Sequence, residues 1–344
     1  MSLGNDVVTA VHPAGEGLLP GVSVVIPVFN SAKVLPMLVA RLAPVLEEIA
    51  PGAHELILVN DGSLDESWAA AASVADEHHW VRASDLMRNY GQHNALLCGL
   101  RSARHEITVT MDDDLQHPPE ELPKLLERLE DGFDVVYGIP LQHTHSPARN
   151  LMSRLTKATM AQAMDIGGIR DISAFRALRT ELRSASASYA SPTVILDVLL
   201  SWGTIRFGTV KVRHEPRAAG DSGYTIGKLF NHTMLILTGF STKPLRMASL
   251  IGFVFTAIGA GVLAFVVAVA LTQNSVPGFP FLASLIAIFG GVQLFALGIL
   301  GEYLARMFER SMDRPPYAIR CTIGAGRPRE ALPAVTPARS PAVD

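Results

Sequence analysis

The chain has 344 residues and a formal net charge of −3, from 29 Lys and Arg against 32 Asp and Glu. This length suggests roughly two structural units. The balanced charge and the lack of a basic block are not typical of a nucleic-acid-binding protein. The two cysteines have neither metal-site nor disulfide spacing, which indicates a reducing compartment.

The first part of the chain predicts a disordered lead followed by an α/β domain. Residues 1–20 contain charged residues and no apolar core, so they are not typical of a signal peptide. Residues 21–225 alternate apolar runs of strand length with segments of helical composition, and this alternation predicts a mostly parallel sheet with helices on both faces. The predicted strands are 22–28, 55–60, 81–86, 106–111 and 134–137, and the predicted helices are 32–50, 65–79 and 92–103.

Polar clusters follow the first four predicted strands. They read PVFN, NDGSLDES, MRNYGQ and DDDLQHPP in chain order. Parallel sheets of this kind bind ligands at the carboxyl ends of their strands, so these clusters are the predicted site. The chain has neither a G-x-G-x-x-G nor a Walker phosphate loop, so the charge of a bound phosphate has to be balanced by another device.

A bound divalent cation could balance this charge. Three consecutive acids, Asp112, Asp113 and Asp114, are candidates to hold it. If the strand stays extended through Asp114, then Asp112 and Asp114 point to one side and Asp113 points to the other, where it would be dispensable. Two carboxylates and the amide oxygen of Gln116 suit Mg²⁺ or Mn²⁺. The alternative is a solvated acidic turn in which Asp114 lies near a helix N-terminus.

The C-terminal third predicts a membrane hairpin. Residues 247–301 contain no Asp, Glu, Lys or Arg, which is enough for spans at 247–271 and 280–300 around a polar turn. A buried hairpin in a soluble protein is the alternative. Lys243 and Arg246 precede the first span and several arginines follow the second, so the positive-inside rule places both termini and the large domain in the cytoplasm.

Three shorter segments complete the predicted organisation. Residues 226–246 are expected to form amphipathic helices on the membrane surface. Residues 301–324 are expected to be a cytoplasmic C-terminal segment, and the Pro- and Ala-rich residues 325–344 a disordered tail.

The motifs VVIPVFN, VNDGSLDES, RNYGQHNALLCGL and MDDDLQHPPEELP resemble those of family 2 glycosyltransferases with the GT-A fold. The later GDSGYTIGKLF, STKPLRMASLIGF and GVQLFALGILGEYLARMFERSMDRPPY narrow the resemblance to polyisoprenyl-phosphate glycosyltransferases. The sequences of these motifs are most similar to those of bacterial undecaprenyl-phosphate sugar transferases of the 4-deoxy-4-formamido-L-arabinose and glucose types. The resemblance covers roughly residues 21–317.

This resemblance implies an inverting, metal-dependent enzyme of the inner membrane. It would move a sugar from a nucleotide-sugar, with a UDP-sugar favoured, to an undecaprenyl or decaprenyl phosphate at the cytoplasmic face. A GDP-mannose-type mannosyltransferase and a catalytically impaired membrane scaffold are the alternatives. Relatives also imply a homo-oligomer.

The resemblance assigns donor-side roles residue by residue. Asp112 would reach the ribose or the metal, and Asp114 and Gln116 would hold the metal. The nucleotide-binding candidates are Pro27 and Asn30 beside the nucleoside, Asp61 at the base, and Asn89, Gly91 and Gln92 along the diphosphate. Each of these residues also has a purely structural alternative: Asn30 could cap the next helix, Asp61 and Gly62 could form a turn, and Gly91 could begin a helix.

The acceptor is a phosphate monoester that is mostly a dianion at pH 7, so it needs placement more than a base. The arginine fork suits this task. Arg149 and Arg217 match arginines that hold the acceptor phosphate in the family, with Arg154 and Lys157 as supporting candidates. Alternatively, this basic stretch faces anionic lipid head groups.

Two departures from the family pattern concern the same region. Pro140 stands where relatives carry an arginine, and His143 or His145 could replace it. Asp171 falls near, not on, the position of a family acid that is sometimes assigned as a base, so it joins Asp112 and Asp114 as a catalytic candidate. Ser173 and Arg176 match the family segment more directly.

Overall fold

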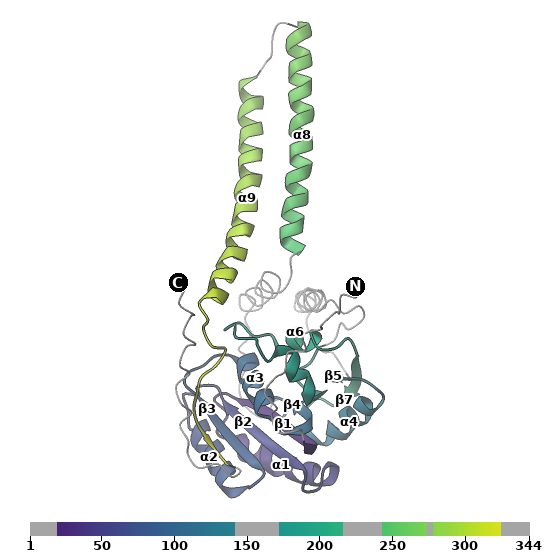
Figure 1. The fold of residues 1–344 in the computed structure, drawn as a ribbon, viewed down its shortest axis with the longest axis vertical. Helices are drawn as coiled ribbons and strands as arrows, with labels where there is room; N and C mark the ends of the chain where they lie inside the picture. Colours follow the sequence, from purple (N-terminus) through teal and green to yellow (C-terminus); the bar gives the residue numbers. More distant parts are fainter. Residues whose placement is uncertain (1–18, 142–171, 216–242, 274–277, 325–344) are drawn as a thin grey trace, which may run out of the picture.

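The computed structural model of the chain describes residues 19–141, 172–215, 243–273 and 278–324 (Figure 1). The predicted lead up to residue 18, the amphipathic segment up to residue 242 and the tail from residue 325 lie outside these ranges. The described residues form an α/β domain and a long helical hairpin that projects from it.

One eight-stranded sheet forms the centre of the described domain, in the order β7-β5-β6-β4-β1-β2-β3-β8. The pairs β1–β2, β1–β4, β2–β3 and β5–β7 are parallel, whereas β6 and β8 are antiparallel to their neighbours. The prediction of a mostly parallel sheet is therefore confirmed. The strands are β1 (Leu19–Val28), β2 (His54–Asn60), β3 (Val81–Leu86), β4 (His105–Thr110), β5 (Val135–Pro140), β6 (Arg176–Arg179), β7 (Phe207–Val212) and β8 (Ile319–Ile323).

Helices cover both faces of this sheet because its central strands are apolar on both sides. On β1, Val24 and Ile26 pack into one core and Val25 into the other. The first core includes residues of α1 (Leu35–Ile49), α2 (Ser67–Glu77) and α4 (Leu122–Glu130), and the second includes residues of α3 (Gln92–Ser102) and α6 (Leu196–Ser201). There are two short 3-10 helices among the described elements. The first, η1 (Pro119–Glu121), directly precedes α4, and the second, η2 (Thr180–Ser186), directly follows β6.

The hairpin consists of α8 (Lys243–Gln273) and α9 (Phe279–Ser311), which are long and apolar enough to cross a membrane. Their apolar windows, Leu245–Val262 and Ile288–Ser311, are only 6% and 0% buried within the protein. A soluble core hairpin would be mostly buried, so the exposure favours membrane spans over that alternative. At 31 and 33 residues the helices are about 46 and 50 Å long, which exceeds the hydrocarbon thickness of a bilayer.

The chain after the hairpin returns to the α/β domain. Helix α9 continues past the predicted end at residue 300 to Ser311, and residues 319–323 then form β8 on the free edge of β3. Figure 1 shows this strand running down the outer side of the sheet from the base of α9. The predicted C-terminal segment at 301–324 therefore contains the end of α9 and the strand that completes the described sheet.

Candidate active site

The carboxyl ends of β1, β2 and β3 lie side by side. The register pairs Val28 with Asn60 and Asn60 with Asp85, so three chain segments leave the sheet at the same level. Strand β4 lies on the other side of β1. The four polar clusters that follow these strands therefore meet at one edge of the sheet, as their positions in the sequence predicted.

The loop after β1 is held against the loop after β2. Asn30 adopts the left-handed conformation with φ of 55°. Its backbone N–H donates to Ser63 Oγ at 3.0 Å, and its side-chain Oδ1 accepts from the backbone N–H of Leu64 at 2.9 Å. The cap of α1 is Val34, so the alternative that Asn30 caps this helix is wrong. Pro27 is buried within β1, one residue before its end.

Asp61 holds the loop after β3. Its two carboxylate oxygens accept the backbone N–H groups of Tyr90 and Gly91 at 2.7 and 2.9 Å. Burial raises the pKa of Asp61, and these two hydrogen bonds oppose that rise. Gly91 has φ of 99° and is the N-cap of α3, so it has the structural role that was the alternative to nucleotide binding. Because each carboxylate oxygen can accept more than one hydrogen bond, a contact between Asp61 and a base stays a prediction.

Gly62 allows the loops after β2 and β3 to touch. It has φ of 64°, in the left-handed region that favours glycine. A Cβ atom at this position would lie 2.4 Å from the backbone nitrogen of Asn89. The two backbones can therefore approach this closely only where the side chain is absent, and Asn89 is held beside Asp61 as a result.

The acidic motif differs from its predicted geometry. Strand β4 ends at Thr110, and the chain turns at Asp113 and Asp114 instead of staying extended. Asp112 Oδ1 accepts the side-chain amide of Gln92 at 2.6 Å, which brings two predicted donor-side residues together. Asp113 Oδ2 accepts the backbone N–H of Phe29 at 3.2 Å. Asp113 therefore has a contact with the β1 loop that the expectation of a dispensable residue missed, and its burial raises its pKa.

Asp114 and Gln116 belong to one tight turn in which Asp114 Oδ1 accepts the backbone N–H of Gln116 at 3.1 Å. The carbonyl of Gln116 in turn accepts the N–H of Glu215 at 2.8 Å. Among the described residues, no group of three or more His, Cys, Asp or Glu side chains is arranged for a metal ion. Two carboxylates and an amide are nevertheless hard oxygen donors that fit Mg²⁺ or Mn²⁺ when a ligand completes the shell.

The acceptor-side candidates lie outside the described residues. These are Arg149, Arg154, Lys157, Arg217, His143, His145 and Asp171. Ser173 is described, and its hydroxyl accepts the backbone N–H of Phe175 at 3.2 Å. Pro140 ends β5 and lies opposite Val212 of β7.

Arg176 is the first residue of β6, and its side chain is fully buried. It forms an ion pair with Asp197 of α6, and its Nε donates to Thr110 Oγ1 at 3.0 Å. The hydroxyl of Tyr137 donates to the same Asp197 oxygen at 2.8 Å. This buried cluster was missed by the sequence analysis, although a lone acid within the apolar stretch VILDVLL was a signal for it.

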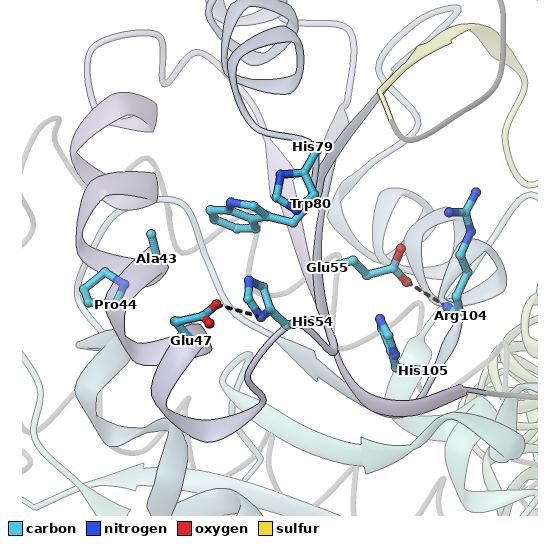
Figure 2. A pocket seen from close by; sticks show the side chains of 10 residues that line it. Ala43, Pro44, Glu47, His54, Glu55, His79, Trp80, Arg104 and His105 are labelled. Carbon is cyan, nitrogen blue, oxygen red and sulfur yellow. Dashed lines mark hydrogen bonds and ion pairs between the residues drawn. The ribbon is translucent and has the colours of Figure 1, made fainter.

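A separate pocket lies at the amino ends of the strands (Figure 2). Its lining includes His54 at the start of β2, Trp80 just before β3 and His105 at the start of β4. The carboxylate of Glu55 in this pocket already accepts the backbone N–H of Arg104 at 2.8 Å. This pocket is therefore at the edge of the sheet opposite the four polar loops and is not the predicted site.

Comparisons with known proteins agree with the motifs. Residues 23–184 match the model of glycosyl transferase family 2. The chain is 34% identical over 320 residues to the undecaprenyl-phosphate 4-deoxy-4-formamido-L-arabinose transferase of Proteus mirabilis, which covers 90% of this chain and 96% of that protein. The chain belongs to glycosyl transferase family 2. The corresponding protein of Pseudomonas aeruginosa strain LESB58 is 33% identical over 308 residues, or 88% of this chain and 91% of that protein.

Solved structures of other proteins are also similar to this family 2 glycosyltransferase. One is glucosyl-3-phosphoglycerate synthase from Mycobacterium tuberculosis in complex with Mn²⁺, UDP-glucose and phosphoglyceric acid. It is 18% identical, covers 64% of this chain and 78% of that chain, and has a TM-score of 0.48. The predictions of the family, of the GT-A fold and of a glycosyltransferase are confirmed.

Proposed function

We propose that this glycosyltransferase transfers a sugar from a UDP-sugar to undecaprenyl or decaprenyl phosphate at the cytoplasmic face of the inner membrane. The convergence of four polar loops at the carboxyl edge of the sheet, with Gln92 bonded to Asp112, carries the proposal. Relatives named as undecaprenyl-phosphate transferases over most of the chain support the acceptor class. The two long apolar helices support a membrane location.

The donor would lie across the carboxyl edge of the sheet. Asp61 sits between the loops after β2 and β3, where a base and ribose can be held from both sides. The diphosphate would then run past Gly91 and Gln92 toward Asp112, because α3 begins there and the N-terminus of a helix favours negative charge.

The acidic turn would hold the divalent cation. Asp112, Asp114 and Gln116 are the proposed ligands, with oxygens of the donor diphosphate and water completing the shell. When bound, Mg²⁺ or Mn²⁺ neutralises the negative charge that develops on the departing nucleoside diphosphate. The contact between Gln92 and Asp112 would orient this carboxylate toward the diphosphate.

The proposed reaction is a direct displacement with inversion. An oxygen of the acceptor phosphate forms a bond to the anomeric carbon while the bond from this carbon to the diphosphate oxygen breaks, and the electron pair leaves with the nucleotide. The acceptor phosphate is already mostly a dianion at pH 7, so the step needs placement and charge balance more than a general base. Arg149, Arg154 and Arg217 are the proposed acceptor-phosphate ligands, and Asp171 remains a catalytic candidate.

The test uses the full-length protein in nanodiscs with undecaprenyl phosphate and a panel of labelled UDP- and GDP-sugars, with Mg²⁺, Mn²⁺ or a chelator. We expect lipid-linked product from a UDP-sugar, dependent on the metal. Asp114→Asn should reduce transfer roughly 100-fold or more, on the scale of a lost electrostatic contact to the reacting groups. Asp131→Asn, an exposed acid beyond α4, is the matched control and should leave transfer unchanged.

Other outcomes identify the alternatives. Product from GDP-mannose alone would establish the mannosyltransferase alternative, and no product from any donor would favour the scaffold. Full activity of Asp114→Asn, or of the wild-type protein in chelator, would remove the metal from the proposal.

A further inference from the structure

The strand that follows the membrane hairpin is built into the donor side of the domain. Strand β8 pairs with β3 through Asp85–Cys321 and Leu86–Ile319, and the backbone N–H of Met87 donates to the carbonyl of Ala318 at 2.9 Å. These contacts lie at the carboxyl end of β3, directly before the loop that carries Asn89 and Gly91. The segment that leaves the membrane therefore ends beside the proposed donor site.

Arg320 anchors this strand to a buried acid. Its guanidinium lies 3.2 Å from Asp85 Oδ2 and also donates to the carbonyl of Met87 at 3.1 Å. The side chain of Asp85 is only 5% exposed, whereas that of Arg320 is 58% exposed. A buried carboxylate needs partners that balance its charge, and Arg320 supplies a cation from the solvent side.

A line of hydrogen bonds continues from Asp85 across the edge of the sheet. Asp85 Oδ1 accepts the amide of Asn60 at 2.7 Å, and Asn60 Oδ1 accepts the hydroxyl of Ser63 at 2.6 Å. Ser63 Oγ accepts the backbone N–H of Asn30 at 3.0 Å. We call Arg320, Asp85, Asn60, Ser63 and Asn30 the edge network. It joins β8, β3, β2 and the loop after β1, and it ends at Asn30, a proposed nucleoside-binding residue.

A second contact joins the same segment to the start of α3. The side-chain amide of Asn94, which is buried, donates to the carbonyls of Pro316 and Pro192 at 2.5 and 2.9 Å. Asn94 lies in the first turn of α3, two residues after Gln92, which contacts Asp112. Both ends of the proposed donor site are therefore attached to the chain that emerges from α9.

We propose that Arg320 is a positioning residue for the nucleotide-sugar, acting through the edge network. The docking of β8 thereby makes donor binding depend on the segment that follows the membrane hairpin. The proposal rests on the proposed function, because it concerns the donor side of that site. It explains why an arginine with a mostly exposed side chain faces one of the most buried acids of the described domain.

The test is steady-state kinetics of full-length Arg320→Ala and Arg320→Lys in nanodiscs, with the nucleotide-sugar that the wild-type protein uses. For Arg320→Ala we expect the donor KM to rise roughly tenfold, the scale of one lost charge-assisted hydrogen bond, with the acceptor KM within twofold of wild type. Arg320→Lys should recover part of the loss because it restores the cation. Arg314→Ala, an exposed arginine of the same segment, is the matched control and should behave as wild type.

The edge network also predicts the outcome of a double-mutant cycle. Ser63→Ala interrupts the same line of hydrogen bonds without touching β8, so it should also raise the donor KM. The double variant should then be less affected than the product of the two single effects, because both act through one connection. An unchanged donor KM in Arg320→Ala, an equal rise in both KM values, or fully multiplicative effects would overturn the proposal.

Hydrogen exchange of the ligand-free protein keeps this test separate from the proposed function. We expect faster amide exchange at residues 61–64 in Arg320→Ala than in Arg314→Ala. If the wild-type protein transferred no sugar, the proposed function would fail, while unchanged exchange at residues 61–64 would independently overturn the role of Arg320.

Discussion

Removing the carboxylate of Asp197 should destabilise the catalytic domain far more than removing an exposed acid. Asp197 forms an ion pair with Arg176 and accepts the hydroxyl of Tyr137, and the side chains of Arg176 and Asp197 are 2% and 3% exposed. In Asp197→Ala the guanidinium keeps its bond to Thr110 but loses its counter-charge inside the protein. A water molecule in the space left by the carboxylate can accept a hydrogen bond from the guanidinium, but it cannot neutralise its charge.

The magnitude follows from this burial. Breaking a buried ion pair by removing one partner costs about 3–5 kcal/mol, because an uncompensated charge remains. For a domain of about 150–250 residues each kcal/mol lowers the Tm by about 2–4 °C, so we expect a decrease of roughly 6–20 °C. Asp131→Ala, which breaks the exposed pair between Asp131 and Arg128, should cost about 1 kcal/mol or less.

Tryptophan fluorescence is a suited assay, because Trp68, Trp80 and Trp202 all lie in the catalytic domain and none lies in α8 or α9. Thermal unfolding of the full-length protein in alkyl-maltoside micelles, which contain no tryptophan, therefore reports this domain alone. Two further variants sharpen the measurement. Asp197→Asn keeps the hydrogen-bond acceptor and should lose less, and the double variant Asp197→Leu with Arg176→Met should recover much of the loss because no charge stays buried.

Two results would refute this reasoning. One is a Tm of Asp197→Ala that falls no further than that of Asp131→Ala. The other is a double variant that is less stable than Asp197→Ala. Either result would mean that the charge of Arg176 is not confined to the interior.

Gly62→Ala should lower the Tm and raise the donor KM. Gly52→Ala is the control, because Gly52 has the same φ of 64° but open space around it, so this variant should show only the smaller cost of backbone strain. An equal decrease in Tm for the two variants would contradict the close contact at Gly62. Burial lowers the pKa of His117 to about 4, so the folded protein binds fewer protons than the unfolded chain and loses up to about 3 kcal/mol as the pH falls from 6.5 through 4. Thermal unfolding of His117→Phe should lack this part of the acid sensitivity, and a parallel pH profile would contradict it. Burial also raises the pKa of the Cys98 thiol to about 12, so iodoacetamide should modify Cys321 in the folded protein and Cys98 only after denaturation, as mass spectrometry can check.

Local patterns were sufficient to predict much of the fold. The buried central strands are near-continuous apolar runs, and a sheet covered on both faces buries such runs, so the positions of β1 to β5 and the mostly parallel order could be predicted. The strands β6, β7 and β8 were not predicted. The absence of charge over residues 247–301 likewise predicted the hairpin. These features depend on composition and period, which the chain carries without reference to its distant parts.

The sites at which prediction failed involve turns and distant partners. Extended geometry through Asp114 was wrong because the chain turns after Asp112, and Leu115 follows with φ of 59°. The contact of Asp113 with Phe29 joins residues 84 positions apart, and no local period encodes such a contact.

By itself, the sequence determined the class of the domain, the hairpin, the family and the residue types gathered at the carboxyl edge of the sheet. Only the tertiary structure decided how these residues are held: Gln92 against Asp112, Asp61 against the β3 loop, and Arg320 of β8 against Asp85. The physical reason is that a buried polar group must find its partner wherever the fold brings one within reach. For Asp85, the cationic partner Arg320 comes from beyond the membrane hairpin, 235 residues along the chain.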